Sequence, residues 1–476
     1  MYFNSIDFAV FLPIVFVLYW FIVRNQLKLQ NLLMVFSSYV FYAFWDWRFL
    51  SLILLSTVVD YIVGRGLGNT SNTFRRRFFL WISILVNLGI LGFFKYFNFF
   101  IDNFTDAFSF LGTSLKPRGL DIVLPVGISF YTFQTLSYTI DVYKQKLKPT
   151  KDIVAFAAFV SFFPQLVAGP IERATNFLPQ FYKKRVFDYS KAVDGVRQVL
   201  WGLFKKIVIA DICGVYVDII FNGSDSYSGS TLFLGAIFFS FQIYGDFSGY
   251  SDIAIGTSRL FGFNLRKNFA FPYFSRDIGE FWRRWHISLS TWFRDYLYIP
   301  LGGNRRNKMI VTRNVLIVFV VSGLWHGANW TFIIWGLLNA LYFLPLILTT
   351  NNRKYMDVVA EGRKHPTVKE LISMLFTFLI ITFSWIFFRS NSIEHALSYI
   401  SELFSSSFFT IPEIHPFRLL GILLIFIAVE WFGRENEYAI EKLGVQWKPI
   451  YRYGIYYAIL IAIFWFGNKD QQFIYF

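Results

Sequence analysis

The sequence has little cysteine, little histidine and few charged residues for its length. Among 476 residues there are one cysteine, five histidines and 16% charged residues. The single cysteine, Cys213, excludes a disulfide within the chain and a metal cluster held by several thiolates. So few charged residues cannot cover the surface of a soluble protein of this length, which excludes the soluble enzyme classes.

Signatures of several other protein classes are also missing. The chain contains no GxSxG nucleophile elbow, no phosphate-binding loop and no dinucleotide-binding glycine pattern. Their absence argues against a serine hydrolase and against a nucleotide-driven pump. The first apolar run contains Asp7 and has no basic residues before it, so we do not expect a cleaved signal peptide.

Hydrophobic and aromatic residues are present in excess. They include 61 Phe and 15 Trp, and the mean hydropathy is +0.46. This composition indicates a protein that lies in lipid, with helices of about 20 apolar residues crossing the bilayer. Such runs lie near 6–23, 30–46, 49–64, 78–98, 122–141, 152–168, 195–220, 231–256, 314–350 (one broken helix or two), 371–388, 416–432 and 452–467. We predict an all-α polytopic membrane protein with roughly 11–13 crossings in a single domain over residues 1–476.

The net charge of +15 is carried by the connections between the apolar runs. Arg24 and Lys28 follow the first run, four arginines between 65 and 77 follow the third, and four lysines between 144 and 151 follow the fifth. Basic residues in every second loop are typical of cytoplasmic loops, which places the N-terminus outside. Because the basic residues stay in these loops, we do not expect nucleic acid as a partner.

The segment 259–313 combines charge with aromatic residues. It holds eleven Lys or Arg residues, three acidic residues and many Trp, Phe and Tyr residues. This combination predicts an amphipathic or re-entrant segment at the cytoplasmic interface. Its basic residues are candidates to bind the phosphates of an acyl donor, although they also serve as orientation signals. The donor-binding candidates in this segment are Trp282, Arg283, Arg284 and Arg294.

His326 is the strongest catalytic candidate. The segment 314–350 around it contains no Asp, Glu, Lys or Arg, and an ionisable group inside a membrane is a functional candidate by default. Burial would keep the imidazole neutral, as a general base requires. Gly323 and Gly327 permit a close approach of backbones or a break in the helix. Asn329 and Trp330 supply nearby polar groups, and Asn329 and Trp325 are candidates to bind substrate or donor. The alternative role for His326 is a hydrogen bond to a neighbouring helix.

His286 is the second catalytic candidate. It lies in FWRRWHISLSTWFRDY, and we expect the positive field of Arg283, Arg284 and Arg294 to keep its imidazole neutral. It can orient a substrate or assist His326, but an interfacial histidine without a catalytic role fits the sequence equally well. Two imidazoles without a carboxylate cluster at ligand spacing do not predict a metal site.

Two aspartates occur in an otherwise apolar or small stretch, FQIYGDFSGYSDIAIG, at 241–256. Carboxylates at membrane depth need partners, and we expect Arg residues of 259–313 to pair with Asp246 and Asp252. Asp246, Ser248 and Tyr250 are also candidates to contact substrate or donor.

Six long motifs resemble the membrane-bound O-acyltransferase family, and in particular its bacterial branch of alginate O-acetylase membrane subunits and teichoic acid D-alanyl transferases. They are MYFNSIDFAVFLPIV at 1–15, LPVGISFYTFQTLSY at 124–138, FPQLVAGPIER at 163–173, YGDFSGYSDIAIG at 244–256, FWRRWHISLSTWFRDYLYIPLGGNR at 281–305 and SGLWHGANWTFIIWG at 322–336. The ending FIYF is also similar. The motifs are colinear and run across essentially the whole chain.

The resemblance implies both a fold and catalytic positions. The fold is a ring of tilted helices around a thin centre, with a tunnel from a cytoplasmic donor entrance to an outer acceptor opening. His326 matches the family's invariant histidine, and His286 matches a second functional position. The resemblance further implies a bacterial inner-membrane enzyme that works with an extracytoplasmic partner protein on a cell-surface polymer.

The function hypothesis is therefore O-acylation, most simply acetylation, of an exopolysaccharide such as alginate or of a cell-wall polymer. The donor would be acetyl-CoA or a thioester on a phosphopantetheine carrier, with no permanently bound cofactor and no metal. Two alternatives remain at this point. One is a lipid or protein acyltransferase of the same fold, and the other is a transporter of an acyl donor or glycan that uses His326 as a proton relay.

Overall fold

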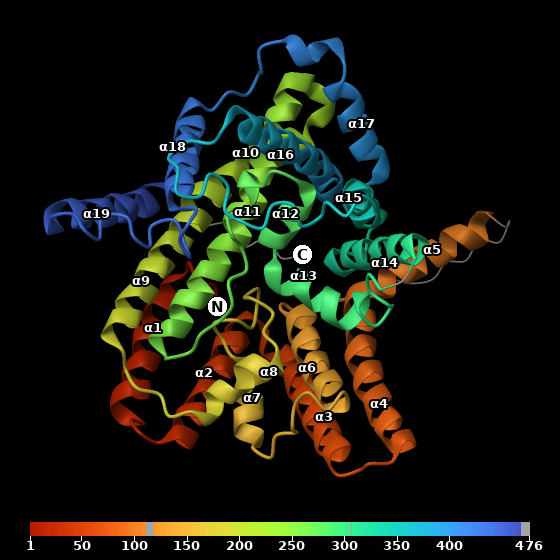
Figure 1. The fold of residues 1–476 in the computed structure, drawn as a ribbon, viewed down its shortest axis with the longest axis vertical. Coiled ribbons are helices and arrows are strands. Elements are labelled where there is room, and N and C mark those ends of the chain that lie inside the picture. The colour runs from red at the N-terminus through yellow and green to blue at the C-terminus, as the bar shows by residue number, and fades with distance from the viewer. Residues whose placement is uncertain (111–118, 306, 468–476) are drawn as a thin grey trace. The chain divides into compact units, whose positions relative to one another are not determined.

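The computed structural model describes residues 1–110, 119–305 and 307–467 of the chain (Figure 1). Within these ranges the secondary structure is helical and contains no β-strand, which confirms the predicted all-α class. Arg306 of the basic segment and the FIYF ending lie outside the described residues. The chain forms two compact units: unit 1 comprises Met1–Ala192 and Thr257–Arg266, and unit 2 comprises Val193–Gly256 and Lys267–Phe476. The expectation of a single domain over 1–476 stays a prediction.

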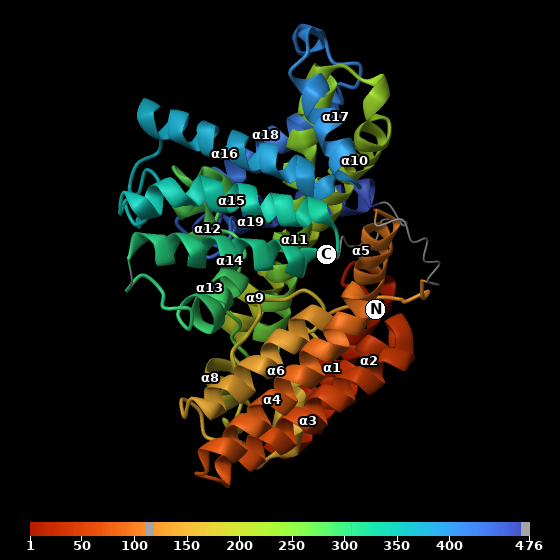
Figure 2. The ribbon, with the colours of Figure 1, turned by 90° about the vertical axis from the view of Figure 1, so that its right-hand side faces the viewer.

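Unit 1 holds the first eight helices. They are α1 (Ile6–Val17), α2 (Leu27–Asp46), α3 (Leu50–Gly68), α4 (Thr73–Leu91), α5 (Phe97–Phe110), α6 (Ile128–Tyr143), α7 (Ile153–Ser161) and α8 (Ala174–Phe177). Helices α3, α4 and α6 lie side by side (Figure 2). They are joined by the buried carboxylate of Asp60, which accepts hydrogen bonds from Asn87 Nδ2 at 2.7 Å and Thr139 Oγ1 at 2.9 Å. Polar bonds of this kind hold helices together where lipid supplies no hydrophobic drive.

Unit 2 holds most of the remaining chain. Its helices are α9 (Tyr189–Phe204), α10 (Asp211–Asn222), α11 (Gly229–Leu260), α12 (Ile278–Arg284), α13 (Ile287–Phe293), α14 (Lys308–His326), α15 (Trp330–Leu348), α16 (Val368–Arg389), α17 (Ile393–Leu403), α18 (Phe417–Gly433) and α19 (Pro449–Phe466); the first residues of α9 and the last of α11 belong to unit 1. Helices α14, α15 and α16 lie side by side (Figure 2).

Among the described residues, six helical stretches are long and apolar enough to cross a membrane, which agrees with a multi-pass membrane protein. They are Leu27–Gly68, Thr73–Phe108, Lys308–His326, Trp330–Leu348, Val368–Arg389 and Pro449–Phe466. The first two, of 42 and 36 residues, each contain more than one helix. The number of crossings, roughly 11–13 from the length of the apolar runs, stays a prediction.

Proline and glycine determine where the helices end in two of the predicted spans. The run at 152–168 is helical only from Ile153 to Ser161, since Pro164 lacks an amide proton and disfavours helix in the residue before it. The run at 314–350 forms two helices, α14 and α15, separated at 327–329. The sequence left this second case open, and the break begins at Gly327, directly after the end of α14.

Helices α9 and α11 approach each other through glycines. A Cβ atom placed on Gly202 would lie 2.6 Å from the carbonyl oxygen of Gly249, and one placed on Gly249 would lie 2.8 Å from the carbonyl oxygen of Gly202. Small residues at a helix interface allow backbones to pack this closely in membranes. The contact brings the part of α11 that carries Asp246 and Asp252 close to the end of α9.

We predict that Gly202→Ala destabilises the protein by roughly 1–3 kcal/mol, because its methyl group would also lie 2.9 Å from the backbone nitrogen of Ile253. The measurement is the midpoint of thermal unfolding in detergent. Gly421→Ala in α18 is the matched control: it meets no atom within 4 Å and should leave stability equal or slightly higher. Equal behaviour of the two variants would contradict the close α9–α11 contact.

Candidate active site

His326 is the last residue of α14 and lies at the turn of the α14–α15 helical hairpin. The hairpin packs closely because glycines face backbone: a side chain on Gly323 would collide with the carbonyl of Phe332, and one on Gly336 with that of Phe319. His326 is buried, with 7% of its surface exposed. The chain therefore places an imidazole at a rigid corner inside unit 2, as the flanking glycines predicted.

Aromatic rings surround His326. The ring centroids of Trp335 and Phe388 each lie 5.2 Å from that of the imidazole, and the ring of Trp325 lies 4.9 Å away. All three meet the imidazole edge to face. The imidazole is therefore packed among apolar ring faces and edges, with little of its own surface exposed.

His286 lies where the chain changes direction between α12 and α13. Its backbone is left-handed, with φ of 42° and ψ of 54°. This conformation is uncommon for a residue with a side chain and stores about 1–3 kcal/mol of strain, a feature that tends to occur at functional sites. The turn directs the ring into the interior, where His286 is only 1% exposed.

Trp325 connects the two histidines. Its ring lies 4.9 Å from that of His326 and 6.2 Å from that of His286, measured between centroids. On its other sides the ring of His286 meets Phe247 of α11, at 4.5 Å, and Phe269, at 6.3 Å. The structure thus brings both predicted catalytic histidines and Trp325 into one aromatic neighbourhood.

The neutral state expected for His286 has a cause in addition to the predicted arginine field. Burial lowers the pKa of the His286 imidazole well below its usual value, because an apolar environment penalises the charged form. The neighbouring arginines are engaged elsewhere. Burial thus accounts for the lowered pKa of His286, and a contribution from the field of the three arginines stays a prediction.

The three arginines proposed to bind donor phosphates make contacts within the protein. Arg283 donates to the carbonyls of Asn352 and Tyr355, at 2.5 and 2.6 Å. Arg284 pairs with Glu280 at 2.9 Å, whereas Arg294 pairs with Asp295 at 2.8 Å. Arg283 and Arg284 therefore anchor neighbouring segments of the chain, and a role in donor binding stays a prediction.

The buried aspartates of α11 pair with lysines rather than with arginines of 259–313, so that part of the prediction was wrong. Lys205 Nζ lies 2.6 Å from Asp252 Oδ2, and Lys206 Nζ lies 2.7 Å from Asp246 Oδ1 and 2.8 Å from Asp211 Oδ1. Both lysines belong to the π-helical turn Lys205–Ala210 that follows α9. Turns of this kind are rare and are frequent at functional sites.

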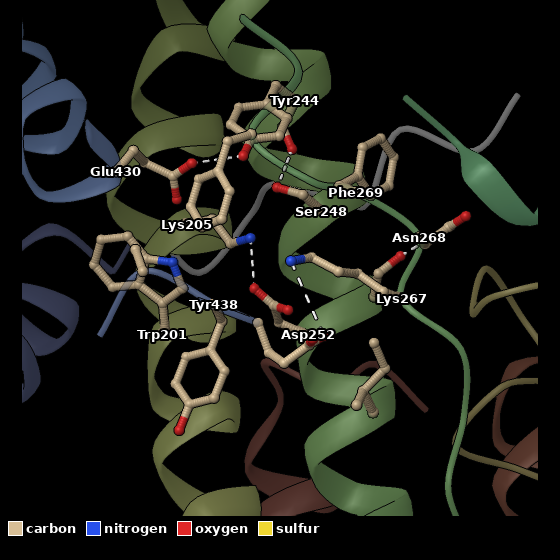
Figure 3. Close-up of a pocket in the computed structure, with 15 residues that line it drawn as sticks. Trp201, Lys205, Tyr244, Ser248, Asp252, Lys267, Asn268, Phe269, Glu430 and Tyr438 are labelled. Carbon is tan, nitrogen blue, oxygen red and sulfur yellow. Dashed lines mark hydrogen bonds and ion pairs between the residues drawn. The ribbon is translucent and has the colours of Figure 1, made fainter. Parts of the chain in front are cut away.

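A small charged pocket lies beside these pairs (Figure 3). Its volume is about 10 Å³, enough for roughly one water molecule. Figure 3 shows the Lys205 ammonium directed at Asp252 and the Tyr244 hydroxyl directed at Glu430, to which it donates at 2.6 Å. Asn268 also lines the pocket, and its side chain reaches His286 Nδ1 at 3.1 Å.

The other predicted site residues have distinct surroundings. Asn329 caps α15 by accepting from the Thr331 amide at 3.0 Å and donates to the Asn391 carbonyl at 2.9 Å, so its amide is engaged. Ser248 is buried and donates to the Tyr244 carbonyl. Tyr250 is buried in α11.

Trp282 packs edge to face on Trp335, with centroids 5.8 Å apart, and so belongs to the aromatic shell of His326. Within the described ranges no group of three His, Cys, Asp or Glu side chains is placed to hold a metal ion. The expectation of a metal-free site stays a prediction.

Sequence reasoning missed Lys205, Lys206 and Asn268. The two lysines had a usable signal, because they stand together in the apolar stretch WGLFKKIVIADICG, where charged residues are unexpected. Asn268 had none: it is one asparagine in a polar segment, and only the folded chain places it against His286.

The sequence is also similar to that of known proteins. The model of the MBOAT, membrane-bound O-acyltransferase, family matches residues 144–389. A probable alginate O-acetylase of Azotobacter vinelandii is 38% identical over 93% of this chain and 86% of its own. A peptidoglycan O-acetyltransferase of Helicobacter pylori is 38% identical over 98% of this chain and 88% of its own. A teichoic acid D-alanyltransferase of Bacillus subtilis is 26% identical over 57% of this chain and 70% of its own.

Proposed function

The chain belongs to the membrane-bound O-acyltransferase family, and we propose that it transfers acetyl groups to hydroxyls of a bacterial exopolysaccharide or cell-wall polymer. The acetyl group is favoured because the O-acetylating relatives align with nearly the whole chain, whereas the D-alanyl relative aligns with 57% of it. An alginate-like polysaccharide and peptidoglycan are the acceptor classes that these relatives' names support.

The observation that carries the proposal is the pair of buried imidazoles on either side of Trp325. His326 is held at a helix end by glycine packing, and His286 is held by a strained turn. A site that must abstract a proton from a poorly acidic hydroxyl needs a neutral, fixed base in a water-poor environment. The burial of His326 among Trp325, Trp335 and Phe388 supports this role, because it limits the contact of the imidazole with water.

In the proposed reaction the acceptor hydroxyl oxygen attacks the carbonyl carbon of the thioester. His326 takes the hydroxyl proton as the new C–O bond forms, and the carbonyl oxygen becomes an oxyanion. When the intermediate collapses, the C–S bond breaks and the proton passes from His326 to the leaving thiolate. The products are an O-acetyl ester and a free thiol, and the imidazole returns to its neutral form.

The acetyl donor is a substrate, either acetyl-CoA or an acetyl thioester on a phosphopantetheine carrier, and it enters from the cytoplasm. The basic loops that follow the first, third and fifth apolar runs support this orientation, in which the N-terminus lies outside. In this proposal the enzyme lies in the bacterial inner membrane. An extracytoplasmic acyltransferase completes delivery to the polymer on the outer side.

The test uses inverted membrane vesicles of the native host and of a strain that lacks this chain. Each preparation receives carbonyl-labelled acetyl-CoA, acetylated carrier, D-alanylated carrier or palmitoyl-CoA. We expect alkali-labile acetyl ester in the polymer fraction only when the chain is present. Label in lipid would identify a lipid acyltransferase, and unattached label inside the vesicles would identify a transporter; either result contradicts the proposal.

A further inference from the structure

Asn268 connects the histidine turn to the charged pocket through its side chain. Its Oδ1 atom lies 2.8 Å from Ser288 Oγ, 3.2 Å from the Ser288 backbone nitrogen and 3.1 Å from His286 Nδ1. Its Nδ2 atom donates to Ser251 Oγ at 3.1 Å. Asn268 is completely buried, so these contacts are not shared with bulk water.

The Ser288 amide fixes which way the Asn268 side chain points. A backbone N–H can only donate, so the atom that faces it must be the carbonyl oxygen and not the amide nitrogen. That oxygen is an acceptor and has no proton to give. Ser288 Oγ also faces Nδ1 of His286, at 3.5 Å, but its proton is donated to the same Asn268 oxygen at 2.8 Å. Nδ1 therefore faces two acceptors and must be the protonated nitrogen.

In a neutral imidazole a proton on Nδ1 leaves a lone pair on Nε2. Burial keeps His286 neutral because it lowers the pKa of this imidazole. His286 Nε2 is therefore a proton acceptor, and it cannot stabilise an oxyanion by donating a hydrogen bond.

Asn268 also holds the strained turn through its backbone. Its carbonyl oxygen accepts from the Ile287 amide at 2.9 Å, directly after the left-handed residue His286. Two residues along, the Ala270 amide donates to the Arg284 carbonyl at 2.9 Å. The backbone and the side chain of Asn268 thus set both the direction of the ring and the location of its proton.

We propose that Asn268 is a positioning residue that fixes His286 as the Nδ1–H tautomer, so that Nε2 is the basic atom of this residue in acyl transfer. The inference rests on the proposed function for the catalytic use of Nε2, but the tautomer itself is independent of it. His286 Nε2 then accepts a hydrogen bond from a substrate hydroxyl other than the one whose proton passes to His326, and the oxyanion needs a different donor.

The direct test is ¹⁵N NMR of protein labelled at histidine, which is practical because the chain has five histidines. His286→Gln identifies the His286 signals by their loss. We expect a protonated Nδ1 and an unprotonated Nε2 for His286. A protonated Nε2 would overturn the proposal whatever the acyl transfer activity, and full activity of His326→Ala with the expected tautomer would instead overturn the proposed function alone.

A second test changes the charge that faces Nδ1. Asn268→Asp keeps an oxygen acceptor but adds a negative charge, which raises the pKa of His286. Among the described contacts of the His286 ring are Phe247, Phe269, Trp325 and Ser288 Oγ, which carry no charge. His286 then stays protonated to higher pH, so the acidic limb of the pH–rate profile should move to higher pH.

The matched control is Asn222→Asp, which adds the same charge at an exposed position and should leave the limb in place. A merely structural role for Asn268 predicts a loss of folded protein or of rate without a shift of the limb. An unshifted limb in active Asn268→Asp protein would therefore refute a catalytic use of His286 Nε2.

Discussion

Replacing His326 with alanine should lower the rate of O-acetyl transfer by about 10²- to 10⁴-fold, the range expected for loss of a general base. The hydroxyl of a sugar is a weak nucleophile, and without a base its proton must leave to water, whose access the surrounding aromatic rings limit. The rate is measured in inverted vesicles at saturating donor. The KM for the donor should change little, because the proposed role of His326 lies in the transition state.

The control for this variant is His365→Ala, which removes an exposed imidazole outside the site and should keep the wild-type rate. Both proteins must reach the same abundance in the membrane. A His326→Ala protein that is abundant but retains more than about one tenth of the rate would show that the imidazole is structural.

The second large effect is expected at the buried pair of Lys205 and Asp252. Their side chains are 4% and 12% exposed and 2.6 Å apart, and Asp252 also accepts from Gln198 at 2.8 Å. Lys205→Met leaves the carboxylates of Asp252 and Glu430 buried near each other without this ammonium group. Breaking a buried pair in this way costs about 3–5 kcal/mol, so the thermal midpoint of this 476-residue chain should fall by about 3–5 °C.

Two further variants distinguish the effect of breaking the buried ion pair from the effect of removing a lysine side chain. Lys205→Met combined with Asp252→Asn removes both charges and should recover part of the stability, since replacing a whole buried pair is often nearly neutral. Lys191→Met breaks an exposed pair with Asp188, whose atoms are 3.8 Å apart, and should cost less than about 1 kcal/mol. A Lys205→Met protein as stable as Lys191→Met would contradict the assigned pairing.

The helical membrane class and the burial of His326 could be predicted from the sequence because both depend on local signals. The 37 residues of 314–350 include no Asp, Glu, Lys or Arg, which is visible from the sequence alone. A histidine within such a run is a functional candidate because an ionisable group is unfavourable inside a membrane. The turn at His326 was also foreseeable from Gly323 and Gly327. The helix predicted over 152–168 was too long because the prediction rested on hydropathy alone. Pro164 disrupts a helix locally, so it could have been used to end the predicted helix before this residue.

The partners of Asp246 and Asp252 were not predictable in the same way. The arginines of 259–313 are nearer in sequence than the lysines to which the aspartates bind, and two factors bring the lysines in. One is the π-helical turn at Lys205–Ala210, and the other is the glycine contact between α9 and α11. Neither has a periodic signal that hydropathy reveals.

Asn268 illustrates the limit more sharply. Its importance lies in four contacts to Ser251, His286 and Ser288. These contacts exist only when the segment after α11 folds back onto the turn between α12 and α13. Residue type alone assigns an asparagine to a loop or a cap.

The most direct test of acyl transfer through His326 is the O-acetyl content of surface polymers in a deletion strain. The strain is complemented with the wild-type chain, with His326→Ala or with an empty vector, at equal membrane abundance. We expect the wild-type chain to restore the ester and His326→Ala to leave it at the level of the empty vector. Restoration of the ester by His326→Ala would contradict acyl transfer through His326 and would leave His286 as the candidate base.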